Sequence, residues 1–407
     1  MQVIVVGAGI GGSALALSLE QLGIDYLLLE QAPTFEEVGA GIQLSPNGTK
    51  ILEQLGIGEE LKAFSTEPDF HKYTVWDTGE IVLKTPLKPK VRSAYGHAYF
   101  HAHRADLIDA LTARLNRDRV MMNTKVTDIM QTSTHVKIDL ENRVTLNADI
   151  LIAADGIHST VRSQEFLADS PRPSGYVSWR GIADADAIAH LQIPVSAYVD
   201  MGPRLSFVYY FVSGGKRLNW LALGQTNNPK RESWSQTATR EEVTNAFEGW
   251  YDRPRQVIES TPNIFVTALH DREPLKTWVN GRVALLGDAA HAMLPYHAQG
   301  AVQSLEDAWV LARTLEKHGD KPIEALKRYE TLRFDRANLI VQQSRNAEAW
   351  YHVDTPEEIE ARNERFRNTS DRLRGGFSPQ QHWLYSYNAD KAALGIDHDW
   401  RELRPWS

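Results

Sequence analysis

The sequence predicts an α/β fold in which a parallel sheet is interleaved with an antiparallel sheet and followed by a helical C-terminal region. Residues 3–6, 13–22 and 26–29 have the pattern strand, helix, strand, which is the unit that builds a parallel sheet. In residues 176–223, aromatic and β-branched residues alternate with polar ones, as is typical of a half-exposed antiparallel sheet. Beyond residue 329 the pattern is helical.

Length, charge and cysteine content narrow the class of protein. The chain has 407 residues, a formal net charge of -8 and no cysteine. This length predicts two or three lobes. The acidic balance argues against a nucleic-acid-binding protein, which needs a basic face. Without cysteine there are no disulfides, thiolate nucleophiles or cysteine-ligated metals, which fits a cytoplasmic protein. No apolar run has the length of a membrane helix, and no export signal is expected.

The remaining elements are expected in the following order. Helices are expected at residues 46–55, 105–115 and 301–316, and strands at residues 73–76, 81–83, 149–154, 206–212, 218–223 and 282–286. The continuous apolar run at residues 149–154 suits a strand buried on both faces of a parallel sheet. Residues 213–217 are expected to form the turn of a hairpin. Residues 362–374 are highly charged, which predicts a solvated helix face.

A dinucleotide-binding fingerprint follows the first predicted strand and opens the first helix. Its glycines are Gly7, Gly9, Gly11 and Gly12. The first permits a tight turn, Gly9 lets the backbone approach a pyrophosphate, and Gly12 lets the helix pack on the strand. Glu30 ends the second strand and can accept hydrogen bonds from a ribose diol. The fingerprint predicts a Rossmann-like domain, but it does not distinguish FAD from NAD.

Two later motifs decide between the nucleotides. Residues 153–162 follow a buried strand and contain Asp155, and residues 282–291 form a strand that ends in Gly287 and Asp288. Either aspartate alone could merely cap a helix. With the fingerprint, the two motifs resemble the three signatures of the single-component FAD-dependent aromatic hydroxylases, over nearly the whole chain. The resemblance implies FAD as cofactor and NADH or NADPH as co-substrate.

The resemblance also implies which residues bind FAD. The expected positions are Gly7, Gly9, Gly11 and Gly12 at the pyrophosphate, Glu30 and Gln31 at the adenosine ribose, and Gln43, Arg104, Asp155, Asp288, Gly300 and Ala301 around the rest of the cofactor. The last two lie where the family has a helix N-terminus beneath the flavin pyrimidine. The positive end of a helix stabilises the negative charge that a flavin gains on reduction.

A tyrosine of the antiparallel sheet is expected to face the substrate. In the family it lies four residues before the hairpin glycines, which gives Tyr210, with Ser206 on the same strand face. A longer hairpin would shift the register to Tyr209 and Leu205. Either tyrosine could instead be an ordinary core aromatic.

Three further residues complete the expected catalytic and substrate-binding set. Tyr296 and His297 follow Pro295, in the loop that the family places at the flavin edge. His297 could take a phenol proton when neutral, or pair with a carboxylate when protonated, or be a structural histidine. Gln43 stands where one branch of the family has a histidine proposed to act in catalysis. The catalytic candidates are therefore His297, Tyr210 and Gln43, and the substrate-binding candidates include Tyr296.

The resemblance implies a monooxygenase that hydroxylates a small hydroxylated aromatic or pyridine carboxylate, with decarboxylation where oxygen enters at the carboxylate-bearing carbon. Two alternatives are a flavin dehydrogenase or oxidase without oxygen insertion, and a non-catalytic nucleotide-binding redox sensor. No carboxylate at metal-binding spacing joins the histidines near residue 100, so we expect no metal. We expect a monomer or homodimer.

The domains are expected to be discontinuous along the chain. An FAD-binding domain is expected from residues 1–70, 98–172 and 265–345, a substrate domain from residues 71–97 and 173–264, and a C-terminal helical segment from residues 346–407.

Overall fold

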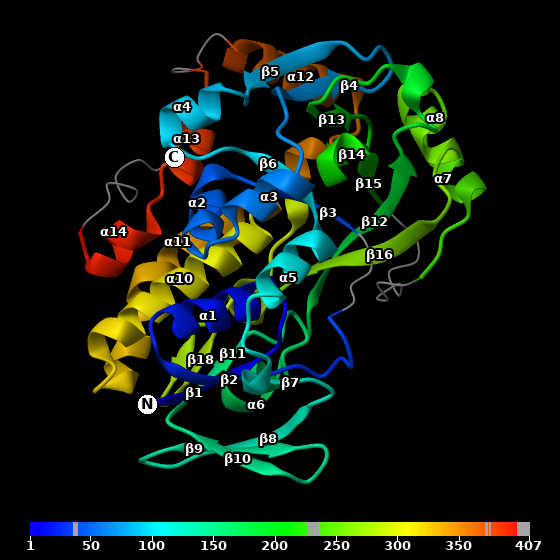
Figure 1. Cartoon of the computed structure of the whole chain (residues 1–407). Coiled ribbons are helices and arrows are strands. Elements are labelled where there is room, and N and C mark those ends of the chain that lie inside the picture. Colours follow the sequence, from blue (N-terminus) through cyan, green and yellow to red (C-terminus); the bar gives the residue numbers. More distant parts are fainter. Residues whose placement is uncertain (36–39, 226–235, 371–372, 374–375, 397–407) are drawn as a thin grey trace.

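A computed structural model describes residues 1–35, 40–225, 236–370, 373 and 376–396. A six-stranded sheet has the strand order β17-β18-β11-β1-β2-β7 (Figure 1). Its strands are β1 (Gln2–Val6), β2 (Asp25–Leu29), β7 (Val120–Met121), β11 (Ile150–Ala153), β17 (Val279–Asn280) and β18 (Val283–Leu285). All neighbours pair in parallel except β17 and β18.

The apolar central strands explain why this sheet lies inside the molecule. In β1, Val3, Ile4 and Val5 are buried and pair with β2 on one side and β11 on the other. The sheet is covered by helices that include α1 (Ile10–Gln21) and α10 (Gly300–His318), which pack against each other. Buried residues of the sheet and these helices form one apolar core.

A seven-stranded sheet has the order β16-β12-β15-β14-β13-β4-β5. Its strands are β4 (Phe70–Val75), β5 (Ile81–Pro86), β12 (Arg172–Asp184), β13 (Ala197–Met201), β14 (Leu205–Val212), β15 (Arg217–Gln225) and β16 (Ile264–Asp271). Only β13 and β4 pair in parallel. One face packs on α7 (Arg240–Ala246) and α8 (Asp252–Glu259), where Phe207, Tyr209 and Trp220 share a core with Val243 and Phe247. The other face lines a cavity together with residues at the ends of β1, β2 and β18 of the six-stranded sheet.

Smaller elements connect and flank the two sheets. Two further sheets have the orders β3-β6 and β10-β9-β8. Their strands are β3 (Gly41–Leu44), β6 (Phe100–His103), β8 (Val126–Gln131), β9 (Val136–Leu140) and β10 (Thr145–Ala148). The other α-helices are α2 (Pro46–Gln54), α3 (Gly58–Phe64), α4 (Lys90–Tyr95), α5 (Arg104–Thr112), α6 (Thr160–Glu165), α9 (Asp288–His291), α11 (Pro322–Tyr351), α12 (Pro356–Ser370), α13 (Pro379–Tyr385) and α14 (Ala389–Leu394). Short 3-10 turns lie at η1 (Arg117–Arg119), η2 (Ala189–Leu191), η3 (Ser213–Gly215) and η4 (Pro295–His297).

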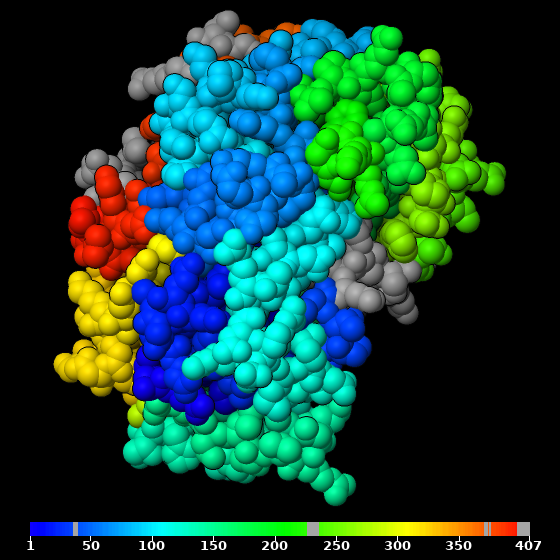
Figure 2. Space-filling model, viewed as in Figure 1, coloured from blue at the N-terminus to red at the C-terminus, as the bar shows by residue number. Residues whose placement is uncertain are grey.

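The C-terminal helices pack on the N-terminal part of the chain. Figure 2 shows α14, in red, beside the yellow α10 and the blue α2 on one face of the molecule. On α14, Asp390 pairs with Lys50 of α2 at 2.7 Å and accepts a hydrogen bond from the indole of Trp309 on α10 at 2.7 Å. No helix in the described residues is long and apolar enough to span a membrane.

The α/β fold class is confirmed, and each expected strand and helix has a counterpart shifted by a few residues at its ends. The solvated face expected at residues 362–374 is wrong for its first part. On α12, Arg362 is buried and donates to the carbonyls of Tyr351 and Met201, and Phe366 is buried beside them. Residues 371–372 and 374–375 lie outside the described residues.

The division into discontinuous domains stays a proposal. Residues 264–271 form β16 and pair with β12 in the seven-stranded sheet, so the expected boundary at residue 265 fits better after Asp271.

Candidate active site

A cavity of about 1140 Å³ lies between the two large sheets. It runs from the glycine turn after β1 to the inner face of the seven-stranded sheet, so its two ends are built by different parts of the fold. Pockets for drug-sized ligands usually measure about 300–1,000 Å³. This cavity therefore has room for a dinucleotide together with a small ring.

Of Gly7, Gly9 and Gly12 in the glycine turn, only Gly9 has space for a side chain. Gly7 has φ +95°, and a Cβ there would lie 2.5 Å from the carbonyl oxygen of Ala154. A Cβ on Gly12 would lie 1.9 Å from the carbonyl oxygen of Gly7. A Cβ on Gly9 would have no atom within 4 Å, and Gly9 lines the cavity. The backbone at Gly9 is thus accessible at the N-terminus of α1, where a phosphate is favoured.

Gly11 also lines the cavity but faces tight packing. A Cβ there would lie 2.6 Å from Cδ2 of Leu286. Its lack of a side chain therefore serves the contact between α1 and the strand end before Gly287.

Glu30 holds the glycine turn from the end of β2. Its two carboxylate oxygens accept hydrogen bonds from the backbone N–H of Ala8 at 2.7 Å and of Ala32 at 2.8 Å. Glu30 and Gln31 both line the cavity. The carboxylate of Glu30 is thus oriented by the main chain, and its role at a ribose stays a prediction.

Asp155 caps a helix and also presents an unused oxygen. Its Oδ2 accepts from the backbone N–H of Thr160 at 2.9 Å and of Val161 at 3.4 Å, at the start of α6. Its Oδ1 is buried without a partner in the described residues, and Asp155 lines the cavity. Burial raises the pKa of this carboxyl. Such an orphaned oxygen is costly unless a ligand donates to it.

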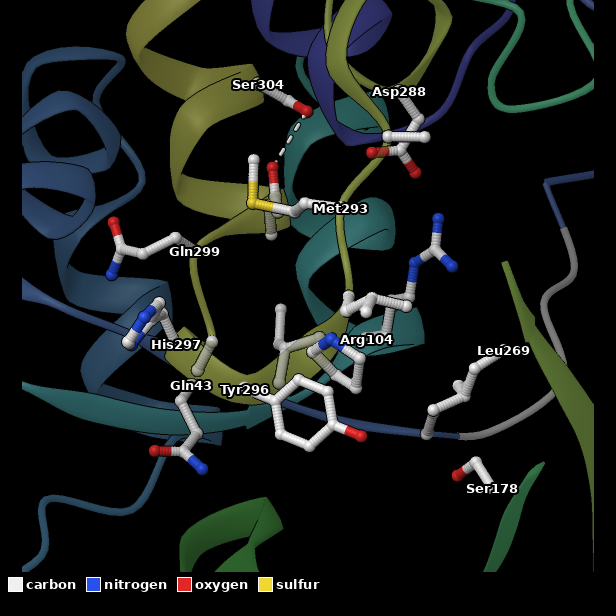
Figure 3. Close-up of a pocket in the computed structure, with 18 of the residues that line it drawn as sticks. Gln43, Arg104, Ser178, Leu269, Asp288, Met293, Tyr296, His297, Gln299 and Ser304 are labelled. Atoms are coloured by element: carbon white, nitrogen blue, oxygen red, sulfur yellow. Dashed lines mark hydrogen bonds between the residues drawn. The ribbon is translucent and has the colours of Figure 1, made fainter. Parts of the chain in front are cut away.

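Asp288 and Arg104 lie on the same side of the cavity (Figure 3). Asp288 is exposed and is the first residue of α9. It directly follows Gly287, which has φ +62°. Arg104 begins α5 after β6. Arg180 of β12 also lines this end, and it could not be predicted from the sequence because only the strand register places it here. Burial, and then the neighbouring Arg104, lower the pKa of Arg180 to about 10.

Gly300 and Ala301 begin α10 and line the cavity. A Cβ on Gly300 would have no atom within 4 Å, so the N-terminus of this long helix is open to a ligand. Gln299, just before the helix, donates from Nε2 to Oγ of Ser45 at 3.0 Å. Asn47 donates from Nδ2 to Oε1 of Glu306 at 2.7 Å. These bonds fix the helix start against α2.

A buried charge cluster anchors the same helix and was not predicted from sequence. Glu306 and Asp307 of α10 are fully buried, as are Arg333 and Arg336 of α11. Arg333 pairs with both acids, and Arg336 donates from Nε to Glu306 at 2.9 Å. His291 of α9 contacts Asp307 at 2.6 Å. The spacing of residues along the chain does not predict which side chains of two different helices will meet when the helices pack.

The register of β14 selects Tyr210 rather than Tyr209. Tyr210 and Ser206 line the cavity, and Tyr209 does not. Tyr209 lies on the opposite face of the sheet, where its hydroxyl is 3.2 Å from that of Tyr251. The hydroxyl of Ser206 is hydrogen-bonded to Nε2 of His352 at 3.1 Å. The shift to Tyr209 and Leu205 is therefore excluded, and the role of Tyr210 toward a substrate stays a prediction.

Tyr296 lines the cavity, but its hydroxyl is engaged elsewhere. It donates to Oε2 of Glu348 on α11 at 3.3 Å, and its ring stacks on Tyr351 with centroids 5.6 Å apart. Burial raises the pKa of the Tyr296 phenol. Its aromatic ring rather than its hydroxyl is therefore offered to the cavity.

His297 and Gln43 lie on one side of the cavity, across from Arg104 (Figure 3). Burial lowers the pKa of His297 to about 4, and a hydrogen bond with the main chain of Gln343 acts in the opposite direction. At neutral pH the imidazole is therefore uncharged, which favours a proton acceptor over a partner for a carboxylate. Gln43, on β3, accepts at Oε1 from the hydroxyl of Tyr99 at 2.6 Å.

No group of three or more His, Cys, Asp or Glu side chains in the described residues is arranged to hold a metal ion. His101 and His103 lie on β6, where His103 contacts Asp106 at 3.7 Å.

Comparison with protein families gives a match to the FAD binding domain over residues 1–344, which is most of the chain. A 3-hydroxybenzoate 6-hydroxylase of Klebsiella oxytoca is 35% identical over 395 residues, which cover 96% of this chain and 98% of that protein. A 6-hydroxynicotinate 3-monooxygenase of Bordetella bronchiseptica is 32% identical over 347 residues, which cover 84% of this chain and 90% of that protein.

A solved structure of a salicylate hydroxylase in complex with its substrate superimposes with a TM-score of 0.82. The two chains are 27% identical, and the match covers 97% of each. The predicted resemblance is therefore confirmed along the chain, as are the fold class and FAD as cofactor.

Proposed function

The chain belongs to the FAD-dependent aromatic monooxygenases, which use NADH or NADPH, and from this we propose that it hydroxylates a small aromatic or pyridine ring that already carries a hydroxyl group. The observation that carries the proposal is the single cavity that joins the glycine turn to the inner face of the seven-stranded sheet. One cavity can hold the cofactor and a ring in contact, as a reaction between them requires.

The described residues fit the cofactor at three points. Gly9 has open space where a pyrophosphate would approach, Asp155 has a buried oxygen that lacks a donor, and Gly300 opens the N-terminus of α10. We propose that these residues, with Glu30 and Asp288, bind FAD. Bound flavin supplies the redox chemistry by which NAD(P)H and dioxygen are used.

The chain's own contribution is to orient the ring, exclude water and handle a proton. The inner face of β14 and β4 covers the ring with Val208 and Tyr73, which restricts the access of water. Neutral His297 accepts a hydrogen bond from the ring hydroxyl, which makes the ring richer in electrons. Tyr210 fixes the ring's orientation from the sheet. Gln43, held by Tyr99, offers its amide N–H groups to the same ring.

The two curated relatives are named for hydroxybenzoate and hydroxynicotinate, which are ring carboxylates. The expected substrate class of hydroxylated aromatic or pyridine carboxylates, with decarboxylation where oxygen enters at the carboxylate-bearing carbon, comes from this likeness. A cytoplasmic location and a monomer or homodimer also remain proposals.

The experiment that tests the proposed function uses the purified protein with FAD bound. A panel of phenols, hydroxypyridines and their carboxylic acids is scored for NADH and NADPH oxidation and, by mass spectrometry, for a product heavier by one oxygen atom. We expect at least one ring to stimulate both. Oxidation of a ring without external NAD(P)H would instead indicate a dehydrogenase or oxidase, and no response to any ring would contradict a hydroxylase.

A further inference from the structure

The charged and the neutral side chains of the cavity wall are separated along the seven-stranded sheet. Arg180 lines the cavity from β12, near one edge of the sheet. His71 and Tyr73 line it from β4, at the other end of the strand order, and Thr85 lines it from β5. Tyr210 lies between these ends on β14.

A ring carboxylate in the neutral part would meet no buried cation among the described residues. The wall formed by β4, β5, β13 and β14 is lined by His71, Tyr73, Leu83, Thr85, Val199, Ser206, Val208 and Tyr210. None of these carries a fixed charge. Arg365 of α12 also lines the cavity, but it is exposed and lies over the ring of Trp350 at 5.9 Å. Burying a carboxylate without a paired cation is strongly unfavourable.

The same wall holds one buried polar atom that lacks a partner and one hydroxyl that can hydrogen-bond to a ligand. Nε2 of His71 is buried and has no hydrogen-bond partner in the described part of the chain. Tyr210 lines the same part of the cavity, and its hydroxyl can donate or accept a hydrogen bond. A buried polar atom such as Nε2 of His71 costs about 1–3 kcal/mol unless something satisfies it. His71 and Tyr210 both line the cavity, so a bound molecule can hydrogen-bond to them.

A second uncharged histidine packs against the ring of Tyr210. His101 of β6 packs against the Tyr210 ring with centroids 4.4 Å apart. Neither of its ring nitrogens has a partner in the described residues. Burial, and then His71, lower the pKa of His101 well below its usual value, and burial lowers the pKa of His71 to about 4. Neither histidine provides a positive charge at neutral pH.

We propose that His71 and Tyr210 form a neutral hydrogen-bonding subsite for the ring substituent farthest from the glycine turn, and that this substituent is uncharged, such as a hydroxyl, an amide or a lactam group. The inference rests on the proposed function and narrows it: the substrate is a hydroxylated ring without a carboxylate at that position. His71 is a substrate-binding residue, and His101 is a positioning residue for Tyr210.

Matched ligands test the charge of the substituent directly. The FAD-bound enzyme is titrated with 3-hydroxybenzamide and 3-hydroxybenzoate, then with the corresponding 4-hydroxy pair, while the flavin absorbance and NAD(P)H oxidation are followed. We expect each amide to bind at least tenfold more tightly than its acid. Equal or tighter binding of the acids would overturn the inference and leave the proposed function intact. No binding and no oxidation with any hydroxylated ring would contradict the proposed function itself.

Substitutions of His71 test whether this side chain binds the substituent. His71→Leu should weaken amide binding by tenfold or more at unchanged FAD content, and His71→Arg should shift the preference toward the acids. His190→Leu, an exposed histidine on the same domain, is the matched control and should change neither. If His71→Leu binds the amides as the wild type does, the subsite is not there. If acids bind well and Arg365→Met abolishes that binding, the cation is Arg365 and the inference is wrong.

Discussion

Arg333 of α11 donates from Nε to Oδ1 of Asp307 on α10 at 2.7 Å, with both side chains fully buried. The other oxygen of Asp307 accepts from the backbone N–H of Gly287 at 3.1 Å. An arginine far along the chain therefore supports the turn that presents Asp288 to the cavity. The stability of the fold and the shape of the cavity at Gly287 and Asp288 therefore depend on the same ion pair.

Replacement of Arg333 by Met should lower the free energy of unfolding by about 3–5 kcal/mol, because Glu306 and Asp307 lose a buried cation. Urea unfolding measures this. Arg313→Met, which removes a partly exposed pair with Glu316, should cost less than about 1 kcal/mol. Similar losses in the two variants would contradict the role of the cluster.

The same variant has a defined pH dependence. Burial alone would raise the pKa of Asp307, but His291 and Arg333 hold it at about 2. A pKa below that of the unfolded chain stabilises the fold above about pH 4, and this stabilisation is lost as the pH falls toward about 2. The stability difference between wild type and Arg333→Met should therefore shrink over that range.

Gly12→Ala should lower the stability of the protein, whereas Gly9→Ala should lower its affinity for FAD. A Cβ at Gly12 would lie 1.9 Å from a backbone oxygen, so Gly12→Ala should destabilise the protein even without cofactor. Gly9 has φ -66° and free space, so Gly9→Ala should keep apoprotein stability and lose FAD affinity. Thermal unfolding of the apoprotein and FAD titration separate the two effects. Normal FAD affinity in Gly9→Ala would show that the pyrophosphate does not bind at this position.

Asp288→Ala should weaken FAD binding by about 1.5–3 kcal/mol, the usual value of a hydrogen bond to a charged group. Asp288 is exposed to the cavity, so the fold should be nearly unaffected. Fluorescence titration with FAD measures the change. Asp186→Ala, another exposed aspartate, serves as control. Unchanged affinity in Asp288→Ala would exclude this contact.

Tyr210→Phe and Tyr209→Phe should separate substrate binding from stability. Loss of the Tyr210 hydroxyl should raise the substrate KM by about 2–12-fold, equivalent to about 0.5–1.5 kcal/mol, with normal FAD content. Tyr209 accepts from Nη1 of Arg253 at 3.1 Å on the far face, so Tyr209→Phe should lower stability and leave KM unchanged. Steady-state kinetics with a ring that the enzyme hydroxylates decide between them. A raised KM in Tyr209→Phe alone would show that the tyrosines are assigned wrongly.

His297→Gln should lower the fraction of NAD(P)H oxidation that yields hydroxylated product. Burial lowers the pKa of His297 to about 4, so it stays neutral from about pH 5.5 to 7.5, where an ordinary histidine titrates. The variant should therefore leave the shape of the kcat/KM profile unchanged in that range. If an inflection near pH 6.5 disappears with the substitution, His297 titrates in that range in the working enzyme. A wild-type profile that falls above this pH would then indicate a protonated partner for a carboxylate, and one that falls below it would indicate a proton acceptor.

The parallel sheet and the nucleotide turn were predictable because their signals are local. A short run of residues contains the strand, the glycines and the acid at Glu30. The choice between Tyr209 and Tyr210 needed the strand register, since neighbouring residues of a strand point to opposite faces. The sequence could not show whether Asp155 caps a helix or faces a ligand, because both roles use the same carboxylate. In the structure Asp155 caps α6 and also lines the cavity.

Other parts of the site were beyond the sequence because they depend on packing between distant elements. Arg180 faces the cavity only because β12 lies between β15 and β16. The hydroxyl of Tyr296 donates to Glu348 on α11. The sequence predicted a helix in this region but not which residues it would contact. The three-stranded sheet of β8, β9 and β10 was not predicted, although residues 136–140 alternate between buried and partly buried positions.

The parallel pairing of β4 with β13 has a consequence for how the protein folds as it is synthesised. Residues 70–75 gain this neighbour only when residues 197–201 have left the ribosome, and β11 gains β18 only after residues 283–285 follow. Pairings between such distant segments raise the contact order and slow folding. The nascent chain therefore carries exposed apolar strands for much of its synthesis, and the cavity is complete only when residues as late as Tyr385, which line it, are present.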